Sequence, residues 1–511
     1  MTTPMPLVRT LPGVVPAWQE TVSREDLRSL CLTQKERGAR LVSLWGSDEG
    51  EENFDLHLAL AVQGGLCWLR VPLPTHDPTY PALDDVFANA NRLQRATQDL
   101  LGLLAQGAAE GRPWLRHNAW PVDRFPLRKG EEGQAYPLLE QKPYPFVTVS
   151  GQGVHEIPVG PVHAGIIEPG HFRFSVVGER VLRLDTQLGY THKGIEKRAE
   201  SLAPTELIHL AGRVSGDSTV AGAWATAQAL ESILGRQVPE RAEWLRALWL
   251  ERERLVNHLG DLGYLCNDVG LSAGFSLFWA LKETALRTHE RLVGHRYLYD
   301  QILLGGVAQG LTVGDCRSLR EECATLEREV HRLQDLLQEH AGVQDRYLNT
   351  GRVTPELAAR LGLVGLAGRA SAQAWDLRVS CPTVPYAQAE VRMATRAQGD
   401  VAARVAVRFD EVFESLRLIR FFIEYLPSGP SLWDASPPLR AGVGVGWVEG
   451  WRGEVFVALE LGAQGQVRRW HPEDVSMSNW PILEHAVQGN IVPDFPLINK
   501  SFNLSYSGQD G

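Results

Sequence analysis

Carboxylates that stand near arginine or between hydroxyl residues are the part of this sequence best suited to chemistry. Asp376 and Arg378 are two positions apart, and Asp217 lies between Ser215 and Ser218. A carboxylate buried beside an arginine can hold or relay a proton, because the guanidinium shifts its pKa. The alternative is a structural network of ion pairs. The candidates for a proton-coupling cavity are Glu196, Asp217, Asp376 and Arg378.

Two short segments place small residues three positions apart. The segment R-V-S-G-D-S carries Ser215 and Ser218. The segment N-L-S-Y-S-G carries Ser505 and Gly508. A serine hydroxyl is a hard donor that is reluctant to ionise, and glycine has no donor in its side chain. These residue types therefore predict no site for a soft transition metal.

The six cysteines do not have the spacing of a zinc or iron-sulfur site. No two of them form a C-x-x-C or C-x-x-x-x-C pair. In a chain without a secretion signal, we interpret them as reduced structural thiols. They are Cys31, Cys67, Cys266, Cys316, Cys323 and Cys381.

Glycine-rich motifs for nucleotide binding are also missing from the sequence. The run Gly442-Val-Gly-Val-Gly446 does not have the G-x-G-x-x-G spacing, and no G-x-x-x-x-G-K-[ST] phosphate loop occurs. We therefore expect no NAD site on this chain. Any NADH-dependent activity would belong to other subunits of a larger assembly.

The composition is that of a large globular protein. The 511 residues are 44% hydrophobic, which predicts two to four domains with cores of their own. A formal charge of -10 argues against binding to nucleic acid, which requires a clustered basic surface. Met1 to Thr10 lacks the pattern of a targeting segment, and no run approaches the ~20 apolar residues of a spanning helix. Membrane attachment would therefore require partner subunits.

Residues 1–130 are predicted to form a small α/β domain. Residues 54–62 alternate with period two, and Gly64-Gly65 precedes a second apolar run at 66–71, which indicates a β-hairpin. Apolar residues then repeat at helical spacing, which predicts a helix over residues 84–106. Residues 131–145 are rich in Gly, Glu, Pro and Gln and are predicted to be a linker.

Residues 146–511 are predicted to form a second, mainly helical domain. Alternating β-type runs occur between Phe146 and Arg183, and again from Gly442 to Leu461. Between them lie two long apolar stripes at spacings of three and four, over residues 319–337 and 405–426. The expected class is α+β: a small N-terminal α/β domain, then a helical-bundle domain with small flanking β-sheets.

Several motifs in a fixed order give the chain a family resemblance. They resemble those of the large subunit of membrane-bound nickel-iron hydrogenases of the formate hydrogenlyase type. The sequence is also similar to the fused C/D subunits of respiratory NADH:quinone oxidoreductase, with a C-like part before the linker and a D-like part after it. The motifs are Gly160–His163, Glu168–Arg173, Tyr190–Lys197, Glu253–His258, Gly260–Asp268 and Gly294–Tyr297.

The resemblance implies a metal site whose ligands this chain does not carry. In the hydrogenase family, four cysteines hold nickel and iron in the patterns R-V-C-G-x-C and D-P-C-x-x-C. Those positions correspond here to Ser215, Ser218, Ser505 and Gly508. We therefore expect no nickel-iron centre and no hydrogenase activity from this chain itself.

The resemblance to the respiratory protein implies a quinone site in altered form. A quinone-contacting histidine of the family corresponds to His171 or, in another alignment, to His163. The tyrosine that pairs with this histidine falls on Gly216, which has no side chain to offer a quinone carbonyl. Quinone binding therefore remains an alternative, through histidine, backbone groups and apolar walls.

The resemblance also implies partners and a location. It predicts an iron-sulfur small subunit, which carries the cluster, and antiporter-like membrane subunits, with the chain peripheral on the cytoplasmic face of the membrane. The expected role is to couple electron transfer to proton or ion movement. One alternative is an NADH:quinone oxidoreductase subunit with an altered quinone site, and another is a non-catalytic scaffold for assembly.

Overall fold

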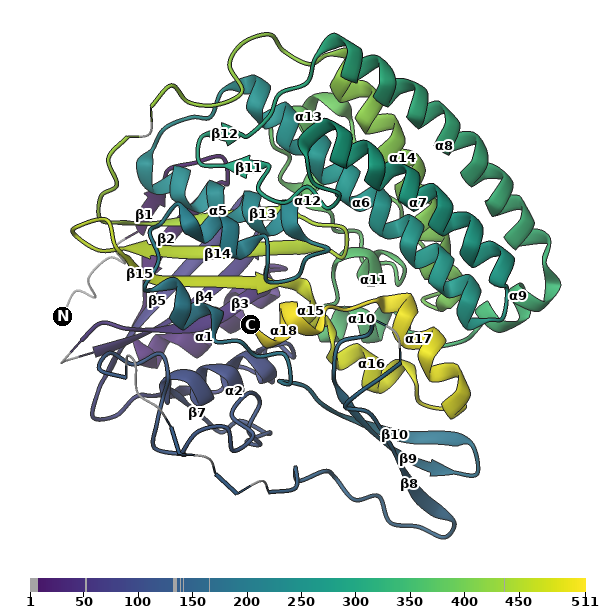
Figure 1. Cartoon of the computed structure of the whole chain (residues 1–511). Helices are drawn as coiled ribbons and strands as arrows, with labels where there is room; N and C mark the ends of the chain where they lie inside the picture. The colour runs from purple at the N-terminus through teal and green to yellow at the C-terminus, as the bar shows by residue number, and fades with distance from the viewer. Residues whose placement is uncertain are drawn as a thin grey trace.

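The α+β class predicted from the sequence is confirmed by the computed structural model, with 43% helix and 19% strand in several small sheets (Figure 1). The structure describes residues 8–50, 53–131, 136–137, 139–140, 142–164, 166–435 and 437–511. Residues 1–7 of the segment searched for a targeting signal lie outside it, as do residues 132–135, 138 and 141 of the predicted linker. The described residues of the predicted linker form no helix or strand.

A five-stranded sheet organises the N-terminal part of the chain. Its strand order is β1-β2-β5-β4-β3, and only the pair β2 and β5 is parallel. The predicted hairpin is confirmed, because β4 and β5 pair antiparallel across the turn at Gly64. The elements are β1 (Val8–Leu11), β2 (Ala17–Thr21), α1 (Arg24–Glu36), β3 (Arg40–Asp48), β4 (Asn53–Val62), β5 (Gly65–Pro74), β6 (Thr79–Pro81), α2 (Ala90–Leu101) and β7 (Leu104–Gln106).

The helix predicted over residues 84–106 is wrong at both ends. It is the shorter α2, which ends at Gly102 in the left-handed conformation, with a φ of 76°. Beyond Gly102, residues Leu104–Gln106 form β7, which pairs in parallel with β6. This pairing holds them in a strand rather than in the predicted helix. The apolar periodicity could not reveal this strand, because three residues are too few to show a period.

Three strands after the linker form a separate antiparallel sheet in the order β10-β9-β8. This sheet extends away from the rest of the molecule, at the lower right of Figure 1. Two short helices and the long α5 follow it. The elements are β8 (Val154–Val159), β9 (His171–Val177), β10 (Arg180–Gln187), α3 (Ile195–Ala199), α4 (Glu206–Ala211) and α5 (Thr219–Leu234).

A bundle of long helices forms the largest part of the fold (Figure 1). The first predicted stripe is confirmed, because its six apolar residues are the buried residues of α8. The second lies on α14, which ends at Glu424, before Pro427. The elements are α6 (Glu240–Asp268), α7 (Ser272–Val293), β11 (Ile302–Leu303), β12 (Gly306–Val307), α8 (Val313–Glu339), α9 (Ala341–Tyr347), α10 (Pro355–Leu361), α11 (Gly365–Arg369), α12 (Leu377–Ser380), α13 (Val384–Ala389) and α14 (Val401–Glu424).

A three-stranded antiparallel sheet, β13-β14-β15, lies between the N-terminal sheet and α5 (Figure 1). Trp45 and Trp68 of the N-terminal sheet pack against Trp447 and Phe456 of this one. On its other side, a Cβ added at Gly446 would lie 1.7 Å from a backbone oxygen of α5. The glycines of Gly442–Gly446 therefore allow a helix to pack closely on β13.

Short helices complete the chain beside the last sheet. α15 continues directly from β15, and α18 brings the C-terminus back beside that strand (Figure 1). The remaining elements are β13 (Gly442–Glu449), β14 (Glu454–Leu461), β15 (Val467–Asp474), α15 (Val475–Asn479), α16 (Pro481–Ala486), η1 (Val492–Asp494), α17 (Phe495–Phe502) and α18 (Tyr506–Asp510). Within the described ranges, no helix is both long and apolar enough to cross a lipid bilayer.

Candidate functional site

The two segments of small residues, nearly 300 positions apart in sequence, meet in the fold. The first forms the turn between α4 and α5, and the second begins α18. The hydroxyls of Ser215 and Ser505 lie 2.9 Å apart. The Ser505 hydroxyl also accepts a hydrogen bond from the Gly508 backbone N–H over 2.9 Å, as the N-cap of α18. The four substituted positions therefore form one site, which we call the serine site: Ser215, Ser218, Ser505 and Gly508.

Asp217 and Arg452 form an ion pair beside the serine site. Arg452 donates two hydrogen bonds to the Asp217 carboxylate, over 2.6 Å and 3.0 Å. Its Nε also donates to the backbone oxygen of Asn503 over 2.5 Å, so the guanidinium links the two segments. Burial raises the pKa of Asp217, but Arg452 and the Ser215 hydroxyl outweigh it and lower the pKa to about 2. Asp217 is therefore ionised at neutral pH.

The space at Gly508 is already occupied by Asp474. A Cβ added at Gly508 would lie 2.9 Å from Cγ and 3.0 Å from Cβ of Asp474. Side chains do not approach this closely without displacing a neighbour. A larger residue at position 508 therefore requires the Asp474 side chain to shift.

Glu253 of α6 is a functional candidate that we did not select from the sequence. Its carboxylate accepts hydrogen bonds from the backbone N–H groups of Val220 and Ala221, over 2.6 Å and 3.2 Å, at the start of α5. Burial raises its pKa to about 8, and the nearby charge of Asp217 also raises it. Glu253 shares a small cavity with Gly216 and Asp217. In the sequence, Glu253 was marked only by its position in Glu253–His258, one of the motifs that carry the family resemblance.

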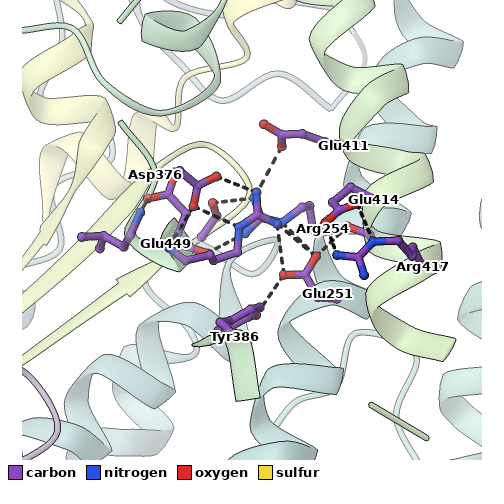
Figure 2. Close-up of polar contacts among 12 residues, drawn as sticks. Glu251, Arg254, Asp376, Tyr386, Glu411, Glu414, Arg417 and Glu449 are labelled. Carbon is purple, nitrogen blue, oxygen red and sulfur yellow. Dashed lines mark hydrogen bonds and ion pairs between the residues drawn. The ribbon is translucent and has the colours of Figure 1, made fainter. Parts of the chain in front are cut away.

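Asp376 and Arg378 lie in a buried charge network, part of which Figure 2 shows. Arg378 donates to Asp376 Oδ2 over 2.7 Å and to Glu251 Oε1 over 3.2 Å. The hydroxyls of Tyr386 and Ser415 also donate to Glu251. The candidate pair is thus surrounded by partners from α6, α13 and α14.

Two further arginines close this network. Arg369 donates to Glu411 over 2.7 Å and to Glu449 over 2.8 Å. Arg254 donates to the backbone oxygens of Glu449 and Gly450 (Figure 2). We call this set the bundle network: Glu251, Arg254, Arg369, Asp376, Arg378, Tyr386, Glu411, Ser415 and Glu449.

The charges of the bundle network nearly balance. Burial raises the pKa of Asp376, but Arg378 and Arg369 outweigh it and hold the pKa below its ordinary value. Burial, together with the charge of Asp376, keeps the pKa of Glu449 above its ordinary value. One carboxyl of the network therefore retains a proton more readily than the others.

Glu196 occupies a third place, at the junction of the N-terminal and C-terminal parts. His471 donates from Nδ1 to Glu196 Oε1 over 2.6 Å, and Arg469 contacts the same oxygen at 3.1 Å. Burial raises the pKa of Glu196, but Arg469 and His471 lower it to about 2. Glu196 is the second residue of the short α3.

The two candidate histidines of the quinone loop lie close together beside β9. His163 Nε2 is 2.8 Å from the backbone oxygen of Gly170, and His171 Nδ1 is 3.3 Å from that of Gly160. The ring of Phe146 lies 5.3 Å from that of His171. His171 Nε2 is buried and has no hydrogen-bond partner among the described residues. Burial lowers the pKa of His171, so this imidazole is neutral at pH 7.

The structure therefore distributes the four proton-coupling candidates over three places. Asp217 lies at the serine site, Asp376 and Arg378 lie in the bundle network, and Glu196 pairs with His471. In the part of the chain that the structure describes, no group of three or more His, Cys, Asp or Glu side chains is placed to hold a metal ion.

Two families of respiratory subunits match successive parts of the chain. Residues 20–137 match the 30 Kd subunit of respiratory-chain NADH dehydrogenase. Residues 268–441 match the 49 Kd subunit of the same enzyme. The order of the two matches follows the order of the parts predicted from the sequence.

Curated relatives and a solved structure cover more of the chain. It is 32% identical to formate hydrogenlyase subunit 5 of Escherichia coli K12 over 484 residues, which are 93% of this chain and 85% of that protein. It is 27% identical to the C/D subunit of NADH-quinone oxidoreductase from Bacteroides thetaiotaomicron, over 81% and 82% of the two chains. A chain of the membrane-bound sulfane sulfur reductase, an archaeal respiratory membrane complex, is similar with a TM-score of 0.67 and 25% identity. That match covers 70% of this chain and 99% of the other.

Proposed function

Because the chain belongs to the family of complex I-related hydrogenase large subunits, we propose that it is a subunit of a membrane-associated redox complex and has no nickel-iron centre. In this proposal, electrons arrive on an iron-sulfur partner subunit. The serine site and its carboxylates take up and release the protons that accompany them. Antiporter-like membrane subunits use this coupling to move protons or other ions.

The observation that carries the proposal is the chemistry of the serine site. Its four positions lie close together, as the ligands of a metal site must. Their side chains, however, are three serine hydroxyls and the hydrogen atom of a glycine. Nickel and iron favour soft thiolates, which ionise readily on binding. Asp474 also fills the space that a fourth ligand would need at Gly508. The residues present do not fit a nickel-iron group.

Proton chemistry is supported by two carboxyls with opposite properties beside this site. The pKa of Asp217 is lowered to about 2, whereas that of Glu253 is raised to about 8. Two neighbouring groups with separated pKa values can act as proton acceptor and proton donor at the same pH. Glu253 is thus a protonated acid beside an ionised carboxylate at neutral pH.

The relatives support the assembly that we propose. Formate hydrogenlyase subunit 5 and the membrane-bound hydrogenase subunit alpha of Pyrococcus furiosus are named as subunits, and the solved structure is a respiratory membrane complex. We therefore place this chain beside an iron-sulfur subunit, on the membrane arm and on its cytoplasmic side. Peripheral attachment requires no spanning helix in this chain.

Metal analysis and one substitution test this proposal. The complex purified with its partner subunits should contain no stoichiometric nickel. Asp217→Asn should reduce turnover by about tenfold or more, because groups that transfer protons contribute at least that much. The matched control is Asp300→Asn, since Asp300 also accepts two hydrogen bonds from an arginine, Arg213, but is exposed.

Three outcomes would contradict the proposal. Nickel near one atom per chain would mean that the serine site holds metal through ligands that we exclude. Normal turnover of Asp217→Asn in an intact complex would favour the non-catalytic scaffold. Reduced turnover in Asp300→Asn as well would indicate a general electrostatic effect rather than a specific role for Asp217.

A second candidate function, quinone reduction, is favoured by the buried Nε2 of His171. The Nδ1–H of this neutral imidazole donates to the backbone oxygen of Gly160, so Nε2 is free to accept a hydrogen bond from the hydroxyl of a reduced quinone. Another observation supports a phenol near Gly216. A Cβ at Gly216 would lie 2.3 Å from the hydroxyl oxygen of Tyr299. The Tyr299 hydroxyl therefore occupies the space that a side chain at position 216 would fill.

Photolabelling with a quinone azide tests this second candidate. Labelled peptides containing His171 or Tyr299 would support a quinone site on this chain. His171→Phe should then abolish the label, while His155→Phe, at an exposed position on β8, should retain it. Labelling confined to partner subunits would contradict the candidate.

A further inference from the structure

Three adjoining cavities lie between the protein surface and the serine site. The first is a surface hollow lined by the exposed side chains of Lys129, Arg198 and Arg468. It shares Lys197 and Arg469 with a second cavity between the N-terminal part and β15. The second cavity shares Glu473 and Gly508, among others, with a third, which is lined by Ser215 and Ser218.

A continuous chain of hydrogen bonds lies along the second cavity. Glu196 accepts from His471 Nδ1 over 2.6 Å. On the other side of the imidazole, His471 Nε2 is 2.8 Å from the hydroxyl of Ser43. The Ser43 hydroxyl donates to Glu473 Oε2 over 3.2 Å. The four side chains thus form the series Glu196, His471, Ser43 and Glu473.

Glu473 is placed to pass a proton between the second and third cavities. It lines both of them, although only 6% of the residue is exposed. Its Oε1 is buried and has no hydrogen-bond partner among the described residues. An unpaired carboxyl oxygen is costly to bury, so its retention beside two cavities calls for an explanation.

We propose that Glu473 is the proton shuttle to the serine site, and that His471 and Ser43 form the relay that supplies it. The inference rests on the function proposed above, because that function requires protons at this site. Ser43 comes from β3, so the N-terminal part of the chain supplies a member of the relay. The two parts of the fused chain would therefore be needed together for proton delivery.

The step conserves protons and charge. The N–H bond of the His471 imidazolium at Nε2 breaks, and its proton binds the oxygen of Ser43. The original hydroxyl proton of Ser43 moves to Oε2 of an ionised Glu473. His471 is then neutral and still donates from Nδ1 to Glu196, while Glu473 is a neutral acid facing the third cavity. A hydronium ion in the second cavity then returns a proton to Nε2 of His471 and becomes water.

The charges around the relay suit this transfer. Burial lowers the pKa of His471, but Glu196 outweighs it and raises the pKa, which favours the imidazolium. Burial also raises the pKa of Glu473, and the charge of Asp474 adds to this, whereas His471 and Ser43 lower it. Arg469, on the same strand, keeps Glu196 ionised. Glu473 therefore accepts a proton more readily than a free glutamate, from an imidazolium that Glu196 stabilises.

A laser pH jump with infrared detection tests the relay in the intact complex. Acid released from o-nitrobenzaldehyde should raise the C=O band of a protonated carboxyl, and Glu473→Gln should remove the Glu473 part of that band. Ser43→Ala should slow the rise of this band by about tenfold or more with unchanged final amplitude, since a missing relay group removes a proton-transfer contribution. Ser43→Thr should restore the rate because it retains a hydroxyl.

The matched control is Glu460→Gln on the neighbouring strand β14. Glu460 is also buried, its pKa is raised to about 7 by burial, and it lines none of the three cavities. This substitution should remove a different band and leave the kinetics of the Glu473 band unchanged. An equally fast rise in Ser43→Ala, or no band lost in Glu473→Gln, would overturn the relay.

This experiment separates the relay from the redox function, because it requires no turnover. A slowed band in Ser43→Ala together with normal turnover in Asp217→Asn would retain the relay and reject the proposed role of Asp217. Unchanged kinetics of the Glu473 band in Ser43→Ala, together with reduced turnover in Asp217→Asn, would reject the relay and retain the proposed function.

Discussion

Two glutamates on the same helix, Glu251 and Glu253, lie in opposite surroundings. Glu251 accepts hydrogen bonds from Arg378, Tyr386 and Ser415 and is 0% exposed. Among the described residues, Glu253 accepts two hydrogen bonds from backbone N–H groups, and it lies beside the cavity that it shares with Asp217. One helix thus supplies a carboxylate to the bundle network and another to the serine site.

The difference shows how to separate structural charges from chemical ones. In the bundle network, guanidinium groups compensate the carboxylates, and the described cavities do not reach Asp376 or Arg378. At the serine site, by contrast, Asp217 and Glu253 line a cavity. Buried carboxylates that are paired with guanidinium groups hold the fold together, whereas an accessible carboxyl without full charge compensation can exchange a proton.

The largest expected effect is on the bundle network. Arg369→Met should destabilise the protein by about 3–5 kcal/mol, because removal of one partner leaves buried carboxylates uncompensated. Arg369 is 0% exposed and bonds to both Glu411 and Glu449. Chemical unfolding followed by circular dichroism would measure the loss.

Arg332→Met is the control for this substitution. Arg332 also pairs with a glutamate, Glu329, but both side chains are exposed on α8. Its removal should change the free energy of unfolding by less than about 1 kcal/mol. Equal losses in the two variants would remove the distinction between a structural network and ordinary surface pairs.

A smaller effect is expected at the serine site. Gly508→Cys should cost about 1–3 kcal/mol, because the new side chain must displace Asp474 in a packed region. Asp474→Ala in the same chain should recover part of that loss, and thermal unfolding of the two single variants and the double variant would measure the coupling. Gly111→Cys, with no atom within 4 Å of its Cβ, is the control. Additive losses in the double variant would contradict the steric explanation.

The smallest effect concerns pH and Glu253. Its pKa is about 8 in the folded chain, compared with an ordinary value of 4.5, so the folded state holds a proton that the unfolded state releases. This contribution to stability is complete below the ordinary pKa and is lost as pH rises towards the folded pKa. Between pH 6 and pH 8 we expect a loss of about 1–2 kcal/mol from this group.

Glu253→Gln isolates that contribution. The amide oxygen can still accept a backbone hydrogen bond but does not titrate. Unfolding curves at pH 6 and pH 8 should therefore differ less in this variant than in the unmodified protein. Glu251→Gln is the comparison, because burial raises the pKa of Glu251 but Arg378 and Arg254 outweigh it and lower it. An unchanged difference in Glu253→Gln would show that Glu253 is not the neutral acid that we describe.

Much of the fold could be predicted from periodicity. The buried stripe of α8 and the hairpin of β4 and β5 follow from local spacing, because one face of each element must be covered. The C-terminal end of the predicted helix at residues 84–106 could not be predicted in this way, since β7 exists only through its pairing with β6. Similarly, the glycines of β13 are required because α5 packs closely against them, and α5 lies more than 200 residues earlier in the sequence.

The sequence by itself determined the fold class and the family. These are properties of residue type and order, which local patterns and motifs preserve. Only the tertiary structure decided which charges share a site. It placed Asp376 and Arg378 in the bundle network, joined Glu196 to His471, and brought Ser43 within hydrogen-bonding distance of both His471 and Glu473. The reason is physical: pKa values and proton transfer depend on distances and burial, which residues far apart in sequence acquire only on folding.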